Sequence, residues 1–215
     1  FREMYGLKAA CVSAVDIVRG IGRLAGMEIL QVPGITGYFD TNYVGKAQHA
    51  LNALENGCDF VLVHVESTDE AGHMGDAKKK IQAIEDVDRL VIGTLLEGLQ
   101  KRGEPFAVLV TPDHPTSVEK RTHLAEPVPF AIYSTDGPKD EVSAYTESAV
   151  KASRTRFEQG FELMRFFLSQ GRSGSGFWRN SNNHCDFTRA PSKSSAGGAC
   201  PVRSTGSLSS AASSS

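Results

Sequence analysis

The chain has 215 residues, enough for one ordinary domain, and its 23 basic and 25 acidic residues give a net charge of −2. This mixed, nearly neutral balance gives no electrostatic reason to expect nucleic acid or an anionic membrane as a partner. No apolar run approaches the roughly 18 residues that a membrane span needs. The chain starts with Phe1 and shows no signal-peptide pattern, so we expect it to begin inside a longer protein.

The first part of the chain alternates strand-like and helix-like segments. Strands are predicted at 8–13 and 28–32, and helices at 15–26 and 43–56. The first helix is predicted from an apolar stripe with a spacing of three, made of Val15, Val18, Ile21 and Leu24. Residues 33–42 contain Gly34 and Gly37 and predict a turn-rich loop.

The alternation continues in the second part of the chain. The continuous apolar run at 59–66 is typical of a parallel strand that is covered on both faces. A long helix is predicted over 77–102, with Asp76 as its N-cap and Gly103 just beyond its end. Two further strands, at 106–111 and 129–133, and a last helix, at 155–169, complete the pattern.

This alternation predicts an α/β fold with three layers, in which helices cover both faces of a mostly parallel sheet. We expect the domain to span residues 1–170. Residues 171–215 are rich in Ser and Gly without an apolar period, and they predict a disordered low-complexity tail. Cys11 and Cys58 lie in apolar contexts and predict buried free thiols, which fits a cytoplasmic protein.

Five residues carry most of the chemical information: Asp69, His73, Asp113, His114 and His123. Carboxylates and imidazoles are the ligands that ions such as Zn²⁺ and Mn²⁺ accept. Each group follows a strand-like run, which is where open α/β sheets place their sites. Any one group alone is more often a chance pair or a solvated loop residue. Their joint placement predicts a divalent-metal site, for two ions, in an α/β enzyme.

The other histidines have simpler interpretations. His49 falls within a helical pattern, and His64 falls within an apolar run and is expected to be a packed strand residue. Glu66 and Asp76 flank the metal motif, and we expect them to support ligands or cap helices rather than bind metal.

Several segments resemble the cofactor-independent phosphoglycerate mutases of the alkaline phosphatase superfamily, in particular their archaeal-type branch. The resemblance covers about residues 4–169. It rests on the segments GLKAACVSAVDIVRGIG, PGITGYFDTNYVGKA, HVESTDEAGHMGD, TPDHPTS and THLAEPVPFAIY.

The resemblance implies a reaction and its cofactors. Two divalent ions, Mn²⁺, Mg²⁺ or Zn²⁺, would bind at the carboxyl edge of the sheet. Residues Asp69, His73 and His123 match the ligands of one ion, and Asp113 and His114 match two ligands of the other. In the family, a serine takes the phosphoryl group of a phosphoglycerate and returns it to the other hydroxyl, which interconverts 2- and 3-phosphoglycerate in glycolysis. Metal ions support such transfers by neutralising charge on the phosphoryl oxygens.

The chain also departs from the family pattern. No serine matches the nucleophile, because Ser13, Ser67 and Ser117 lie elsewhere, and the substrate-holding domain has no counterpart here. We therefore expect the C-terminal part of the catalytic domain, incomplete at its N-terminus and inactive alone. Lys8 falls where relatives place a lysine near the transferring phosphate, but a solvated lysine at a strand start fits equally well.

Three functional hypotheses stay open at this point. The first is a phosphoglycerate mutase, and the second is a phosphatase or phosphopentomutase of the same superfamily. The third is a non-catalytic metal-binding module. The sequence indicates neither the identity of the metal nor the oligomeric state.

Overall fold

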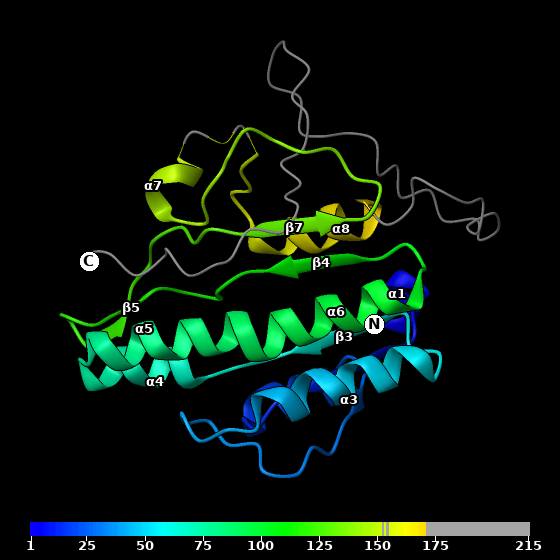
Figure 1. Ribbon diagram of the computed structural model, residues 1–215, viewed down its shortest axis with the longest axis horizontal. Helices are drawn as coiled ribbons and strands as arrows, with labels where there is room; N and C mark the ends of the chain where they lie inside the picture. The colour runs from blue at the N-terminus through cyan, green and yellow to red at the C-terminus, as the bar shows by residue number, and fades with distance from the viewer. Residues whose placement is uncertain (152, 154, 171–215) are drawn as a thin grey trace. The chain divides into compact units, whose positions relative to one another are not determined.

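The computed structural model describes residues 1–151, 153 and 155–170, and they form two compact units (Figure 1). The first unit contains Phe1–Glu104 and His114–Glu126, and the second contains Pro105–Asp113 and the described residues from Pro127 onward. The predicted tail at 171–215 lies outside the described residues. None of the described helices combines the length and the apolar character that crossing a bilayer requires.

The first unit is built around a parallel sheet of three strands in the order β2-β1-β3. The central strand β1 (Ala9–Val12) pairs with β2 (Glu28–Ile29) on one side and with β3 (Phe60–Val63) on the other. All four residues of β1 are buried, with at most 3% of their surface exposed. A parallel strand without charged side chains requires cover on both faces, and β1 has it.

Helices cover both faces of this sheet. Successive strand side chains point to opposite faces, and Ala10 packs with Ala53 of α3 (Tyr43–Glu55). The next residue, Cys11, lies against Gly22 of α2 (Asp16–Leu24), where an added Cβ would come within 3.4 Å of the Cys11 Cβ. The predicted α/β class with helices on both faces of a parallel sheet is confirmed, and Cys11 and Cys58 are free and buried.

The predicted apolar stripe of α2 does not all face the core. Ile21 and Leu24 are exposed, together with Ile17, while Gly22 is the buried residue of the helix. The helix α2 packs on the sheet through Gly22, because a residue without a side chain allows the helix and the strands to approach closely. The spacing therefore predicted the helix correctly but not its buried side.

The predicted helix over 77–102 is confirmed as one continuous helix in Figure 1, made of three segments. It comprises α5 (Ala77–Asp86), a π-helical turn η1 (Val87–Ile92) and α6 (Gly93–Arg102). The Asp76 carboxylate accepts a hydrogen bond from the Lys79 amide at 3.0 Å, which confirms the predicted N-cap. Gly103 ends the helix in the left-handed conformation, with φ +69°.

Four short elements were not predicted in the first unit. A first turn of helix, α1 (Arg2–Tyr5), precedes β1. The segment that carries Asp69 and His73, for which no helix or strand was predicted, is a helix, α4 (Ser67–Met74). Strands β5 (Thr116–Ser117) and β6 (Thr122–His123) form a small antiparallel hairpin.

In the second unit, β4 (Ala107–Val110) pairs with β7 (Ala131–Ser134) in antiparallel register. A short helix α7 (Glu147–Val150) follows, and then α8 (Gly160–Gln170). The last helix was predicted to start at 155, but Phe157 precedes it and packs against Phe130, with tilted rings whose centroids are 5.7 Å apart. Phe161, predicted to face the core, is exposed, whereas Phe167 is buried.

Candidate metal centre

Asp69 and His73 come from one face of α4. They are four residues apart, so the helical period places their side chains side by side. The Asp69 Oδ2 atom lies 3.3 Å from the His73 Nε2 atom. Because α4 starts just after β3 ends, the pair lies beyond the carboxyl end of a parallel strand, where α/β folds place their sites.

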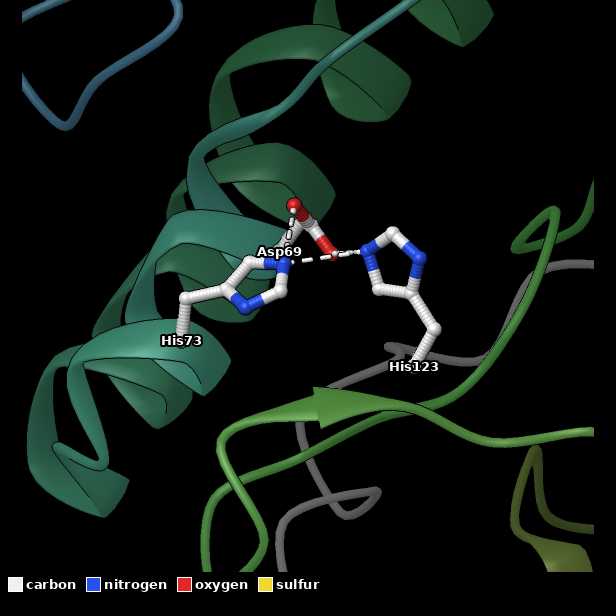
Figure 2. Close-up of side chains that lie close together, drawn as sticks. All are labelled: Asp69, His73 and His123. Atoms are coloured by element: carbon white, nitrogen blue, oxygen red, sulfur yellow. Dashed lines mark hydrogen bonds and ion pairs between the residues drawn. The ribbon is translucent and has the colours of Figure 1, made fainter.

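His123 joins this pair from the β5–β6 hairpin. Its Nε2 atom lies 3.3 Å from Asp69 Oδ1 and 3.0 Å from His73 Nε2 (Figure 2). All three ligand atoms therefore lie within 4.8 Å of one another. The hairpin positions His123 next to Asp69 and His73, because its register pairs His123 directly with Thr116, which lies against α4.

Gly72 allows the hairpin to approach α4. A Cβ at this position would lie 2.7 Å from the Thr116 carbonyl oxygen and 2.8 Å from its Cγ2 atom, closer than real contacts allow. The Lys80 ammonium group also donates a hydrogen bond to the Thr116 carbonyl. The close approach at Gly72 places β5 against α4, which carries Asp69 and His73, and the Lys80 hydrogen bond ties β5 to α5.

The ring of His73 is oriented by a backbone carbonyl. Its Nδ1 atom lies 3.1 Å from the carbonyl oxygen of Arg121. A carbonyl only accepts hydrogen bonds, so Nδ1 carries a proton, and in the neutral ring Nε2 carries the lone pair. Arg121 has a left-handed backbone, with φ 53°, which is unusual for a residue other than glycine and which shapes the turn between β5 and β6.

The cluster fits a divalent metal ion. The Asp69 carboxylate and the His73 Nε2 atom both direct lone pairs toward the space between the three side chains, and the His123 ring faces the same space. Because lone pairs repel one another, a cation or a proton must lie between them. Two ligands each about 2.1 Å from one ion would be roughly 3.0 to 3.4 Å apart, from octahedral to tetrahedral angles. The observed separations of 3.0, 3.3 and 3.3 Å fall in this range.

His114 lies beside this cluster. Its ring lies against that of His123 at a tilt, with centroids 3.8 Å apart, and its Nδ1 atom lies 3.3 Å from the Thr116 hydroxyl. Asp113 is the last residue of the segment Pro105–Asp113, which belongs to the second unit. Its role as a ligand stays a prediction. The structure therefore brings together four of the five predicted metal-site residues: Asp69, His73, His114 and His123.

Lys8 is placed at the opposite end of the sheet from the cluster. It precedes β1, its ammonium group lies 3.4 Å from the Asn56 carbonyl, and its side chain is exposed. The site residues of α4 follow the carboxyl end of β3, which runs parallel to β1. This placement supports the alternative interpretation of Lys8 as a solvated lysine at a strand start.

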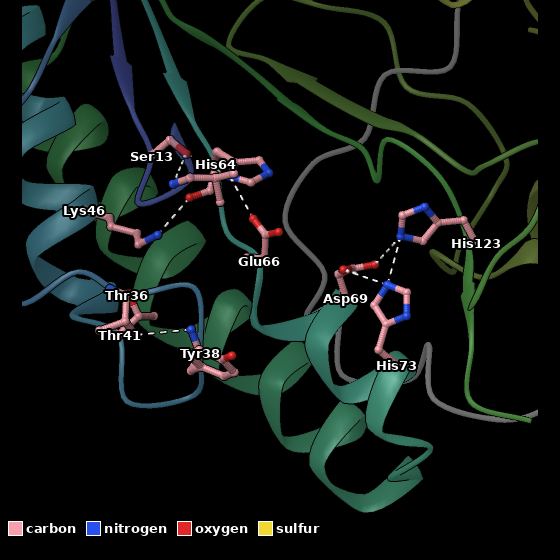
Figure 3. A network of polar contacts seen from close by, with 11 residues as sticks. Ser13, Thr36, Tyr38, Thr41, Lys46, His64, Glu66, Asp69, His73 and His123 are labelled. Atoms are coloured by element: carbon pink, nitrogen blue, oxygen red, sulfur yellow. Dashed lines mark hydrogen bonds and ion pairs between the residues drawn. The ribbon is translucent and has the colours of Figure 1, made fainter. Parts of the chain in front are cut away.

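A partly buried polar network precedes α4 along the chain (Figure 3). The Lys46 ammonium group donates to the His64 carbonyl at 2.9 Å, and His64 Nδ1 lies 3.1 Å from the Ser13 hydroxyl and 3.7 Å from Glu66 Oε2. Burial lowers the pKa of Lys46 to about 8, against the opposing attraction of the Glu66 carboxylate. The network fixes the turn from β3 into α4.

Glu66 has no capping role, although it stands at the N-cap position of α4, because its side chain makes no cap hydrogen bond there. It approaches His64 instead, and its carboxylate lies within 4.8 Å of ligand atoms of Asp69 and Glu70. Exposed acidic groups often gather in this way without a metal ion, so the histidine-containing cluster remains the better candidate.

The serines near the cluster are packed into the fold. Ser13 and Ser67 are buried, at 1% and 0% exposure. The Ser13 hydroxyl accepts from the Val15 amide at 3.0 Å, and the Ser67 hydroxyl accepts from the Tyr43 hydroxyl at 2.8 Å. Burial is also the main reason that the pKa of Tyr43 is raised. These hydroxyls connect structural elements within the fold.

Comparisons with known proteins agree with this geometry. Residues 1–159 match the family model described as the metalloenzyme superfamily. The chain is 49% identical over 152 residues to a 2,3-bisphosphoglycerate-independent phosphoglycerate mutase from Methanosarcina mazei, which covers 70% of this chain and 38% of that protein. A probable enzyme of the same name from Geobacter sulfurreducens is 45% identical over 171 residues, covering 79% of this chain and 42% of that protein.

Two solved structures resemble the chain. One is a protein from Pyrococcus horikoshii, with a TM-score of 0.72 and 30% identity, covering 83% of this chain and 53% of that one. The other is a cofactor-independent phosphoglycerate mutase from Thermoplasma acidophilum, with a TM-score of 0.60 and 26% identity, covering 79% and 38%. The chain thus spans about two fifths of the length of the curated relatives that it matches.

Proposed function

The chain belongs to the metalloenzyme superfamily, and from this premise we propose that it serves in a metal-dependent phosphoglycerate mutase that interconverts 2- and 3-phosphoglycerate in glycolysis. The names of its relatives support the substrate. The convergence of Asp69, His73 and His123 on one point carries the proposal, because it is the feature that a metal-dependent transfer requires.

The residues of the cluster have distinct tasks in this proposal. Asp69 and the Nε2 atoms of His73 and His123 would hold one divalent ion, Mn²⁺, Mg²⁺ or Zn²⁺. His114, and Asp113 by family resemblance, would hold a second. When bound, the ions would neutralise charge on the phosphoryl oxygens and lower the barrier to their transfer.

The chain's own contacts keep these side chains ready for that task. The Arg121 carbonyl holds the His73 ring with its lone pair on Nε2, so no ring rotation is needed on binding. The fixed turn between β3 and α4 keeps Asp69 in place. Such preorganisation matters because a site whose side chains must be ordered on binding has a less favourable binding free energy.

The nucleophile of the proposed reaction is a serine that becomes phosphorylated, by analogy with the family. We expect it in a part of the catalytic domain that this chain does not match, because the chain spans about two fifths of its relatives. The cytoplasm, where phosphoglycerates occur, is the expected location.

Metal binding is the direct test. Calorimetric titration of the metal-free protein with Mn²⁺ and with Zn²⁺ should show binding that falls at least tenfold in His73→Ala and in His123→Ala. His49→Ala is the matched control, because His49 lies within α3 and its Nδ1 atom is 2.9 Å from the Gly45 carbonyl. Equal affinity in all variants would refute the metal centre.

The reaction is tested on the complete gene product. Conversion of 3-phosphoglycerate to 2-phosphoglycerate, coupled to enolase, should depend on Mn²⁺ and disappear in Asp69→Ala. Release of inorganic phosphate without isomerisation would identify a phosphatase instead. Metal binding without either reaction would identify a non-catalytic module.

A further inference from the structure

Thr116 lies between two members of the candidate metal centre. Its hydroxyl donates a hydrogen bond to Asp69 Oδ1 and lies 3.3 Å from His114 Nδ1. Thr116 is 5% exposed, on strand β5 and paired with His123 across the hairpin. One buried hydroxyl therefore contacts one predicted ligand of each metal ion.

The number of protons on these groups fixes the direction of both hydrogen bonds. A carboxylate can only accept, so the single hydroxyl proton of Thr116 goes to Asp69. The lone pair of the hydroxyl then faces His114, which must donate from Nδ1. A neutral His114 ring with a proton on Nδ1 carries its lone pair on Nε2, the form in which that nitrogen is able to bind a metal ion.

We propose that Thr116 is a positioning residue that serves both halves of the metal centre. It holds the Asp69 carboxylate against rotation, and it selects the His114 tautomer whose Nε2 atom is the ligand. This inference rests on the proposed function for its metal ions. Groups that orient metal ligands in this way typically change metal affinity by about 10- to 100-fold when they are removed.

The backbone and methyl group of Thr116 have a separate, structural task. The Cγ2 atom and the carbonyl oxygen lie against Gly72, and the carbonyl also accepts from Lys80. Two substitutions separate this packing from the hydroxyl's task. Thr116→Val keeps the branched shape and removes the hydroxyl, whereas Thr116→Ser keeps the hydroxyl and removes the methyl group.

The first experiment compares metal affinities. Titration with Mn²⁺ should show about a 10- to 100-fold loss in Thr116→Val and a loss of less than about threefold in Thr116→Ser. Thr94→Val is the control for a lost threonine hydroxyl, because Thr94 donates to the Leu90 carbonyl within the long helix. A purely structural role would reverse the order of the two Thr116 variants and would overturn the proposal.

The second experiment needs no metal, and its first measurement uses the unchanged protein. Nitrogen-15 NMR of the metal-free protein at a pH where His114 is neutral should show a protonated Nδ1 and an unprotonated Nε2. Protonation of Nε2 instead would refute the proposal. In Thr116→Val the preference should weaken or reverse, while in Thr116→Ser it should persist.

These outcomes separate the two proposals. If His73→Ala leaves the Mn²⁺ affinity unchanged, the metal centre itself is refuted. If His73→Ala abolishes binding but Thr116→Val binds as tightly as the unchanged protein, only the role of Thr116 is refuted.

Discussion

The Nε2 atoms of His73 and His123 lie 3.0 Å apart, although the two residues are 50 positions apart in the chain. Each atom also lies 3.3 Å from an oxygen of Asp69. The lone pairs of His73 and the carboxylate oppose one another unless a cation or a proton lies between them. The native fold therefore concentrates negative potential at one point and should gain stability from a cation there.

Divalent metal ions should accordingly raise the thermal stability of the protein. A ligand that binds only the folded state at 100 times its dissociation constant stabilises it by about 2.7 kcal/mol. We expect the melting temperature, measured by differential scanning calorimetry, to rise with Mn²⁺ and to fall back with EDTA. In His73→Ala the rise should be smaller, whereas His49→Ala should respond like the unchanged protein. A melting temperature that does not change with Mn²⁺ would contradict metal binding by the cluster.

Lys46 should make stability increase at alkaline pH. Its folded pKa of about 8 lies below the ordinary value of 10.5, because burial disfavours the ammonium form. Between these values the unfolded chain binds more protons than the folded one, so the cost of burying Lys46 is complete below pH 8 and fades above it. Each pH unit in this window changes the free energy of unfolding by about 1.4 kcal/mol.

The test compares the protein with Lys46→Met, which cannot titrate at this position. Urea unfolding in EDTA should show the unchanged protein gaining about 2 kcal/mol relative to the variant between pH 8 and 9.5. A free-energy difference that stays constant over this range would show that Lys46 keeps an ordinary pKa.

Gly72 and Gly20 should respond in opposite directions to replacement by alanine. Both lie inside helices, where alanine is ordinarily favoured by about 1 kcal/mol. A Cβ at Gly72 would lie 2.7 Å from the Thr116 carbonyl oxygen, whereas a Cβ at Gly20 has nothing within 4 Å. We expect Gly72→Ala to destabilise by roughly 1–3 kcal/mol and to weaken Mn²⁺ binding by displacing β5.

Gly20→Ala is the matched control and should stabilise by up to about 1 kcal/mol with unchanged Mn²⁺ affinity. Urea unfolding and calorimetric titration measure the two effects. Equal stability of the two variants would mean that the hairpin is not held against α4 as described.

The 215-residue chain alone should not interconvert phosphoglycerates, even with excess Mn²⁺. The Ser13 and Ser67 hydroxyls are buried and bonded within the fold, and the Ser117 hydroxyl accepts from the Lys120 amide at 3.0 Å. An enolase-coupled assay on the purified chain checks this. Turnover that Asp69→Ala abolishes would prove that a serine within the chain acts as the nucleophile.

The sequence predicted the features that depend on neighbours along the chain. The apolar period of 77–102 predicted its helix, and Asp76 its cap, because both signals are local. Asp69 and His73 were recognisable for the same reason, although no helix was predicted for their segment. A spacing of four brings two side chains together once α4 forms.

Only the tertiary structure decided which distant residues meet. His123 reaches Asp69 because a hairpin packs on Gly72, and no local pattern encodes that approach. Thr116 was missed because a hydroxyl acquires its role from the groups across from it. The strand direction places Lys8 before β1, at the end of the sheet away from the cluster, and its role as a phosphate contact stays a prediction. Local periodicity thus determines elements, while close packing between elements determines the site, since hydrogen bonds and metal ligands act only over a few ångströms.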